Sequence, residues 1–122
     1  GNAGKPILEY NGKEYPLAAG ENIIGRKANS SSATVQIDTS ADAAGRTVSR
    51  EHLKIRVIEL SGGKYKSMVS VYKAKNPTSI NGELLGEEDC IVLHTGDRIK
   101  MGSVTVVFKE STWNDDDMTE AI

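Results

Sequence analysis

The chain has 122 residues, of which 38% are hydrophobic and 26% charged, as in a single globular domain that buries a core without disulfides. Its 15 Lys and Arg against 17 Asp and Glu give a formal net charge of −2, so the strongly basic surface of a nucleic-acid-binding protein is not expected. No apolar run approaches the roughly 18 residues that a membrane-spanning helix needs, so no membrane partner is expected.

The first half of the chain reads as short strands separated by turns and loops. The strands expected here are residues 7–10, 13–17, 22–26 and 35–38. Asn11-Gly12 lies between the first two and is favoured in two-residue hairpins, because both central turn residues need positive φ. Residues 27–33 are polar and serine-rich, and residues 39–48 are small and polar, so both stretches predict loops.

The second half continues in the same way, and its clearest signal is the alternation of apolar and polar residues over 53–60. A turn at 61–64 follows this strand, and Asn81-Gly82 marks another tight turn. The further strand segments expected are residues 65–72, 79–85, 90–93, 98–101 and 104–108. Since no segment keeps a helical period, the sequence predicts an all-β fold, a two-sheet antiparallel β-sandwich.

Cys90 is the single cysteine, which excludes an internal disulfide and a cysteine-built zinc site. We expect it to be a small buried side chain, because the apolar residues 91–93 follow it. A reducing, cytoplasmic location is expected. No metal-ligand cluster, nucleotide loop or nucleophile–base pair is visible, so neither catalytic residues nor metal nor cofactor is expected.

Three short polar segments lie beside the expected strands: residues 25–26, 49–52 and 76–82. They supply a guanidinium, a hydroxyl, further cationic groups and two carboxamides. A phosphate monoester carries about −1.5 to −2 charges near neutral pH and offers three acceptor oxygens. A guanidinium can contact two of these oxygens in parallel. The three segments therefore suit a phosphate ester and the peptide that carries it.

The order and spacing of these segments, Gly-Arg, then Ser-x-x-His, then Asn-x-Thr-x-x-Asn-Gly, resemble the forkhead-associated (FHA) domain, a phosphothreonine-peptide binding module. The resemblance covers roughly Leu8 to Glu110, and Leu93-x-x-Gly96-Asp97-x-Ile99 is similar to the closing signature of the family. It implies an FHA domain over residues 1–110, with recognition loops at one end of the sandwich. The implied function is reversible binding of phosphothreonine-containing proteins without catalysis.

The resemblance also implies a role for each matching residue. The resemblance assigns phosphate binding to Arg26, Ser49, Arg50 and Lys75. Peptide binding falls to Asn76, Arg46 and Thr47. Structural support of the site falls to Gly25, His52, Thr78, Asn81 and Gly82. The chain departs from the family at Pro77, where glycine is usual, and a proline restricts Asn76 to extended backbone.

Two further expectations concern the Ser-x-x-His segment. His52 resembles a histidine that supports the recognition loops from behind, so at least one of its nitrogens should bond nearby backbone. A catalytic role is not expected, because no acid–base partner stands at a suitable spacing. Glu51 is expected to point away from the site, since a carboxylate there would repel phosphate.

Six of the 15 basic residues lie at or beside the polar segments: Arg26, Lys27, Arg46, Arg50, Lys73 and Lys75. If the loops gather at one end of the sandwich, these six residues form what we call the cationic apex. The alternative is that they are scattered around a solvated rim.

Residues 111–122 predict an acidic, flexible tail. Four carboxylates lie here, and without them 15 basic residues face 13 acidic ones, a net charge of +2 for the body of the chain. Thr119 has Ile122 three residues later, so phosphorylated Thr119 is a candidate ligand for the site of the same or a neighbouring chain. The alternative is a solubilising terminus.

Several alternatives stay open in the sequence. An FHA-like scaffold that binds protein without phosphate is the second candidate function. Arg46 or Arg50 would favour an acidic residue three positions after the phosphothreonine, whereas an apolar pocket would favour Ile or Leu. Because the chain begins at Gly1, we expect it to be a piece of a longer protein.

Overall fold

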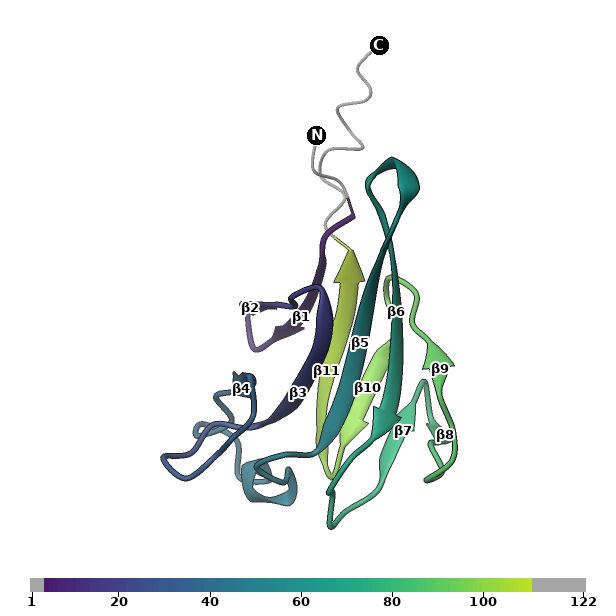
Figure 1. The fold of residues 1–122 in the computed structure, drawn as a ribbon. Helices are drawn as coiled ribbons and strands as arrows, with labels where there is room; N and C mark the ends of the chain where they lie inside the picture. Colours follow the sequence, from purple (N-terminus) through teal and green to yellow (C-terminus); the bar gives the residue numbers. More distant parts are fainter. Residues whose placement is uncertain (1–3, 111–122) are drawn as a thin grey trace.

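The computed structural model describes residues 4–110, and within this range the chain forms eleven strands and two short 3-10 helices (Figure 1). The strands are β1 Pro6–Tyr10, β2 Lys13–Pro16, β3 Gly20–Arg26, β4 Val35–Ile37, β5 Leu53–Leu60, β6 Lys64–Val71, β7 Thr78–Ile80, β8 Glu83–Leu84, β9 Ile91–Val92, β10 Arg98–Met101 and β11 Val104–Glu110. The helices are η1 Gly45–Thr47 and η2 Ser61–Gly63. In the described part of the chain, no helix has the length and apolar character needed to cross a membrane.

The strands form two sheets, which confirms the predicted all-β sandwich. One sheet has the order β2-β1-β11-β10-β7-β8, and the other has the order β4-β3-β5-β6-β9. Among residues 4–110, β3 and β4 form the one parallel pair, and the other paired strands are antiparallel. β1 and β11 pair so that Pro6 lies opposite Glu110.

Both Asn-Gly dipeptides form the hairpin turns that the sequence predicts. Asn11 and Gly12 have φ of 51° and 77°, and they join β1 to β2. Asn81 and Gly82 have φ of 52° and 87°, and they join β7 to β8. These values lie in the left-handed region that such turns require, which asparagine and glycine tolerate best.

The core lies between the two sheets and is built by alternation along the long strands. In β5, Leu53, Ile55 and Val57 are buried, while the residues between them face outward. In β11, Val104, Val106 and Phe108 are buried in the same way. Each such side chain contributes roughly 1.5–3 kcal/mol when it is removed from water, so this alternation fixes the register of both strands.

Cys90 is exposed, which corrects the expectation that it would be buried. The apolar run that follows it does not enter the core as a whole. Ile91 and Val92 form the two-residue edge strand β9 and are 38% and 37% exposed, whereas Leu93 is buried. The run therefore lies along an exposed sheet edge and reaches the core only at Leu93. Cys90 precedes the run and remains exposed.

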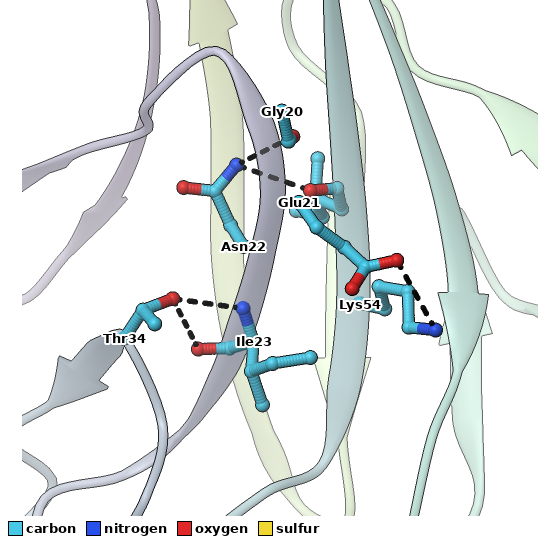
Figure 2. Close-up of polar contacts among 7 residues, drawn as sticks. Gly20, Glu21, Asn22, Ile23, Thr34 and Lys54 are labelled. Atoms are coloured by element: carbon cyan, nitrogen blue, oxygen red, sulfur yellow. Dashed lines mark hydrogen bonds and ion pairs between the residues drawn. The ribbon is translucent and has the colours of Figure 1, made fainter.

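Polar contacts attach β3 to both of its neighbours, as Figure 2 shows. Asn22 is buried, and its carboxamide donates to the carbonyl of Ile55 on β5 at 3.1 Å. Thr34, just before β4, accepts a hydrogen bond from the amide of Ile23 at 2.9 Å. Lys54 and Glu21 form an ion pair across β3 and β5 at 3.4 Å. These contacts hold the first half of β3, and its pairing with β4 continues to its last residue, Arg26, which lies opposite Ile37.

The loops that carry the polar segments gather at one end of the sandwich (Figure 1). β3 and β6 end there, and β5 and β7 begin there. The turn between β10 and β11 lies at the same end, and the β5–β6 hairpin tip projects from the opposite end. The predicted clustering of these loops is therefore present.

Candidate functional site

A cleft of about 310 Å³ lies among the gathered loops. It is lined by Arg26, Ser30, Arg46, Val48, Ser49, Arg50, Glu51, Lys73, Lys75 and Asn76, and we call it the loop cleft. All four residues predicted to contact phosphate line it. Of the three predicted peptide-binding residues, Asn76 and Arg46 line it, while Thr47 bonds to Asn76 beside it.

Gly25 allows the loop after η1 to pack directly on the end of β3. A Cβ atom at this position would lie 1.9 Å from the carbonyl oxygen of Arg50, closer than any real contact. The amide of Arg26 donates to the carbonyl of Ser49 at 3.0 Å, and the amide of His52 donates to the carbonyl of Ile24 at 2.8 Å. The glycine in the Gly-Arg pair therefore permits the close approach that puts Arg26 beside Ser49.

Arg26 is half-buried, and its guanidinium is held at one edge. Its Nε donates to the carbonyl of Val48 at 2.9 Å. The two terminal nitrogens of the fork are not used in this bond and belong to a side chain that lines the loop cleft. A guanidinium fixed in this way is oriented before a ligand arrives, which reduces the entropy cost of binding.

The hydroxyl of Ser49 is positioned from two sides. Its Oγ accepts a hydrogen bond from the amide of Lys75 at 3.1 Å, so the hydroxyl hydrogen remains available for donation into the cleft. Its backbone amide donates to Nδ1 of His52 at 3.0 Å. The segments 49–52 and 75–76 thus meet at this one side chain.

His52 is fully buried behind the cleft. Burial lowers its pKa to about 4, although the nearby carbonyl of Pro77 acts in the opposite direction. Nε2 has no hydrogen-bond partner within bonding distance among the described residues, and Nδ1 accepts from Ser49. The ring is therefore neutral near pH 7 and bonds to nearby backbone.

Glu51 lines the loop cleft, which corrects the expectation that it would point away. Its carboxylate is engaged by protein groups. Oε2 accepts from the amide of Ser32 at 3.0 Å, and Oε1 lies 3.9 Å from Nζ of Lys73. Arg50 is attached to the same 27–33 loop, because its Nη1 donates to Oγ of Ser30. Glu51 thus holds a loop against the site.

Asn76 is tied across the cleft despite the proline that follows it. Its Nδ2 donates to the carbonyl of Thr47 at 2.9 Å. Oγ1 of Thr47 accepts in turn from the amide of Ser103 at 2.9 Å, and the amide of Gly102 donates to the carbonyl of Pro77 at 2.9 Å. The β10–β11 turn therefore joins the two loops that flank the cleft.

Gly102 belongs to the support of the site, and sequence reasoning missed it. It has φ of 60°, and a Cβ atom there would lie 2.4 Å from the carbonyl oxygen of Thr47. A Gly-Ser pair between two strands reads only as a turn. The close contact with Thr47, more than fifty positions earlier, cannot be recognised from the residues next to Gly102 in the sequence.

The remaining predicted support residues do not line the loop cleft. Thr78 is buried at the start of β7. Asn81 donates through Nδ2 to Oδ1 of Asp97 at 3.0 Å and accepts through Oδ1 from the amide of Arg98 at 2.9 Å. Its carboxamide joins the β7–β8 turn to β10, and Gly82 completes that turn.

The loop cleft is strongly cationic. Five of the six residues of the cationic apex line it, and Lys27 lines a neighbouring cleft together with Arg26 and Arg46. Within residues 4–110, Lys73 is the one member of the six that forms an ion pair, with Glu51. No group of three or more His, Cys, Asp or Glu in the same range could hold a metal ion. The cationic side chains of the loop cleft are suited to binding an anion.

Comparison with known proteins identifies relatives of this arrangement. A model of the FHA domain family matches residues 22–102. A structure from an analysis of phosphothreonine-dependent FHA domain interactions is 25% identical, with a TM-score of 0.63, and the match covers 86% of this chain and 95% of that one. The FHA domain of FhaA, complexed with the intracellular domain of Rv3910, is also 25% identical, with a TM-score of 0.62 and coverage of 85% and 99%.

A third solved structure shows the same fold at lower identity. The FHA domain of MEK1, complexed with a phosphothreonine peptide of HOP1, is 19% identical, with a TM-score of 0.68 and coverage of 88% of this chain and 97% of that one. No curated protein sequence matches the chain.

Proposed function

This chain belongs to the FHA domain family, and we propose that it binds phosphothreonine-containing protein segments reversibly through the loop cleft, without catalysis. The observation that carries the proposal is the convergence of Arg26, Ser49, Arg50 and Lys75 in one cationic cleft. The relatives solved with an intracellular protein domain and with a phosphothreonine peptide support it.

The phosphate would be held by groups that already face the cleft. A phosphate dianion has three acceptor oxygens, which match the two terminal nitrogens of Arg26 and the hydroxyl of Ser49. Arg50 and Lys75 add positive charge at the same place. Because bonds to Val48 and to the amide of Lys75 fix the first two groups, little reorganisation is needed.

The peptide carrying the phosphate would be read by Asn76. Its Nδ2 is used in the bond to Thr47, so its orientation is set by the protein. Its Oδ1 has no partner among the described residues and can accept a backbone N–H from an extended peptide. Pro77 is compatible with this orientation, because Asn76 makes its bond to Thr47 with the proline in place.

The test is calorimetric titration of phosphothreonine peptides against their unphosphorylated and phosphoserine twins. Arg26→Ala should remove most of the affinity, since truncating one member of a hydrogen-bonded charge pair costs roughly 2–5 kcal/mol. Lys66→Ala, an exposed cation on β6 away from the loop cleft, is the matched control and should bind normally.

Two outcomes contradict the proposal. A loss below about threefold in Arg26→Ala would remove the assignment of Arg26 to phosphate. Equal binding of phosphorylated and unphosphorylated peptides would instead favour the phosphate-independent scaffold.

A further inference from the structure

A second cleft lies beside the loop cleft, between the end of β3 and the segment that follows β4. Its polar lining consists of Arg26, Lys27, Thr39, Ser40, Asp42 and Arg46, and we call it the flanking cleft. Arg26 and Arg46 line both clefts, so these two arginines form the shared wall. Lys27 lines the flanking cleft but not the loop cleft.

The carboxylates near the flanking cleft are bonded to protein groups. Oδ1 of Asp42 accepts from the amide of Ala44 at 2.8 Å, and Oδ2 accepts from the hydroxyl of Tyr10 at 3.2 Å. Oδ1 of Asp38 accepts from the hydroxyl of Ser40 at 2.6 Å and from its amide at 3.1 Å. The bonds from Ser40, and more weakly the charge of Lys27, hold the pKa of Asp38 below its usual value.

The cations of this cleft are less completely engaged. Among the described residues, neither Lys27 nor Arg46 forms an ion pair within 4 Å. Three cationic side chains line the cleft against the single carboxylate of Asp42. Asp42 and the nearby Asp38 offset at most two of these three positive charges, so the flanking cleft retains a net positive charge.

We propose that the flanking cleft binds a second anionic side chain of the same ligand, so that the preferred partner carries another phosphate or carboxylate near its phosphothreonine. This inference rests on the proposed function. Two anions bound in adjacent clefts would share Arg26 and Arg46 between them, as planar guanidinium groups with several donors allow. A second phosphate should raise the affinity more than a carboxylate does, because it brings more charge and a third oxygen.

The opposite side of the loop cleft has a different character. A groove there shares Lys75 and Asn76 with the loop cleft and is otherwise lined partly by apolar side chains, among them Val71, Pro77 and Leu85. A second anion placed on that side would meet fewer cations. The gain from a second phosphate should therefore depend on the direction in which it lies from the phosphothreonine.

The experiment uses a series of peptides with one phosphothreonine and one phosphoserine, the latter placed in turn at each position from four before to four after. The parent peptide carries serine, and a parallel series carries glutamate. Calorimetry at low salt should show a gain of about threefold to fivefold, confined to one side of the phosphothreonine and smaller for glutamate.

The decisive variant is Lys27→Gln. It should remove most of the gain from the second phosphate while changing the affinity for the singly phosphorylated peptide by less than about twofold. Arg46→Gln should weaken both peptides, since Arg46 lines both clefts. Lys66→Gln is the matched control and should keep the full gain.

The outcomes separate this inference from the proposed function. If no phosphopeptide binds, the proposed function fails. If the singly phosphorylated peptide binds but a second phosphate adds nothing, only the flanking cleft is overturned. A gain that survives in Lys27→Gln, or that is equal on both sides, would reflect long-range attraction and would also overturn it.

Discussion

The backbone amide of Ser49 donates a hydrogen bond of 3.0 Å to Nδ1 of the buried His52. Nδ1 can accept this bond only while it carries no hydrogen, so the bond requires a neutral ring. Burial favours that state by lowering the pKa of His52 to about 4. The position of the Ser49 hydroxyl therefore depends on the protonation state of a side chain behind the cleft.

The first prediction concerns stability at acid pH. In the unfolded chain the pKa of His52 returns to about 6.5, so between pH 6.5 and pH 4 the unfolded state binds a proton that the folded state does not. Stability is unaffected by this group above pH 6.5 and falls as the pH drops towards 4. The loss reaches about 3 kcal/mol. Urea unfolding at several pH values measures this loss in the free energy of unfolding.

His52→Gln provides the control for this effect. The variant should be less stable at pH 7, because it loses the ring that accepts from Ser49, and it should show a flatter pH dependence between 4 and 6.5. An unchanged slope in the variant would assign the acid sensitivity to other groups.

A second prediction concerns Gly25. In Gly25→Ala the new methyl group would meet the carbonyls of Arg50 and Ser49 at 1.9 and 2.7 Å, so the loop that carries both residues must move. We expect a stability loss of roughly 1–3 kcal/mol together with weaker phosphopeptide binding. Gly86→Ala, whose added atom meets only the side chain of Asp89, is the control. Full affinity in Gly25→Ala would show that the close approach is not needed for recognition.

Binding itself should weaken as the pH falls through about 6, where the phosphate loses its second charge. The pKa of His52 is about 4, so its titration lies below this range and does not obscure the effect. Added salt should also reduce affinity, because the cationic side chains are open to solvent. Titrations of a phosphopeptide from pH 7.5 to 5.5 measure the pH effect. An affinity that does not change over this range would mean that the site does not require the phosphate dianion.

The last prediction concerns Thr119, which lies outside the described residues. Thr119 is followed three positions later by Ile122 and is surrounded by acidic residues. A synthetic peptide of residues 114–122 with phosphorylated Thr119 should bind the domain more tightly than an unrelated acidic phosphopeptide. Deletion of residues 111–122 should then change the apparent affinity for other ligands. If neither effect is found, the tail does not act as a ligand.

The features that the sequence predicts well are those decided by neighbouring residues. Asn11-Gly12 and Asn81-Gly82 form hairpin turns because positive φ is a local requirement. The alternation over residues 53–60 gives β5 its bounds, since the period of two reports directly which face is buried. The three polar segments supply Arg26, Ser49, Arg50 and Asn76 to the lining of the loop cleft, and the roles that the family resemblance gives these residues stay predictions.

What the sequence does not predict depends on contacts between distant segments. Glu51 faces the cleft because Ser32, nineteen positions earlier, donates to its carboxylate. Gly102 supports Thr47 through a contact across more than fifty residues. Cys90 precedes an apolar run, but that run crosses the edge of a sheet, and exposure at an edge is set by which strand lacks a neighbour.

The pairing of Pro6 with Glu110 has a practical consequence. The chain enters and leaves the described domain at adjacent positions. β11 runs from the turn beside Thr47 to Glu110, at the end of the sandwich opposite the loop cleft. A host protein could therefore accept the domain as an insert in one of its surface loops, with the cleft projecting outward. A pair of fluorescent reporters attached at these two positions would stay close together whether or not ligand is bound. A biosensor would instead need one dye beside the loop cleft, where the proposed ligand would bind.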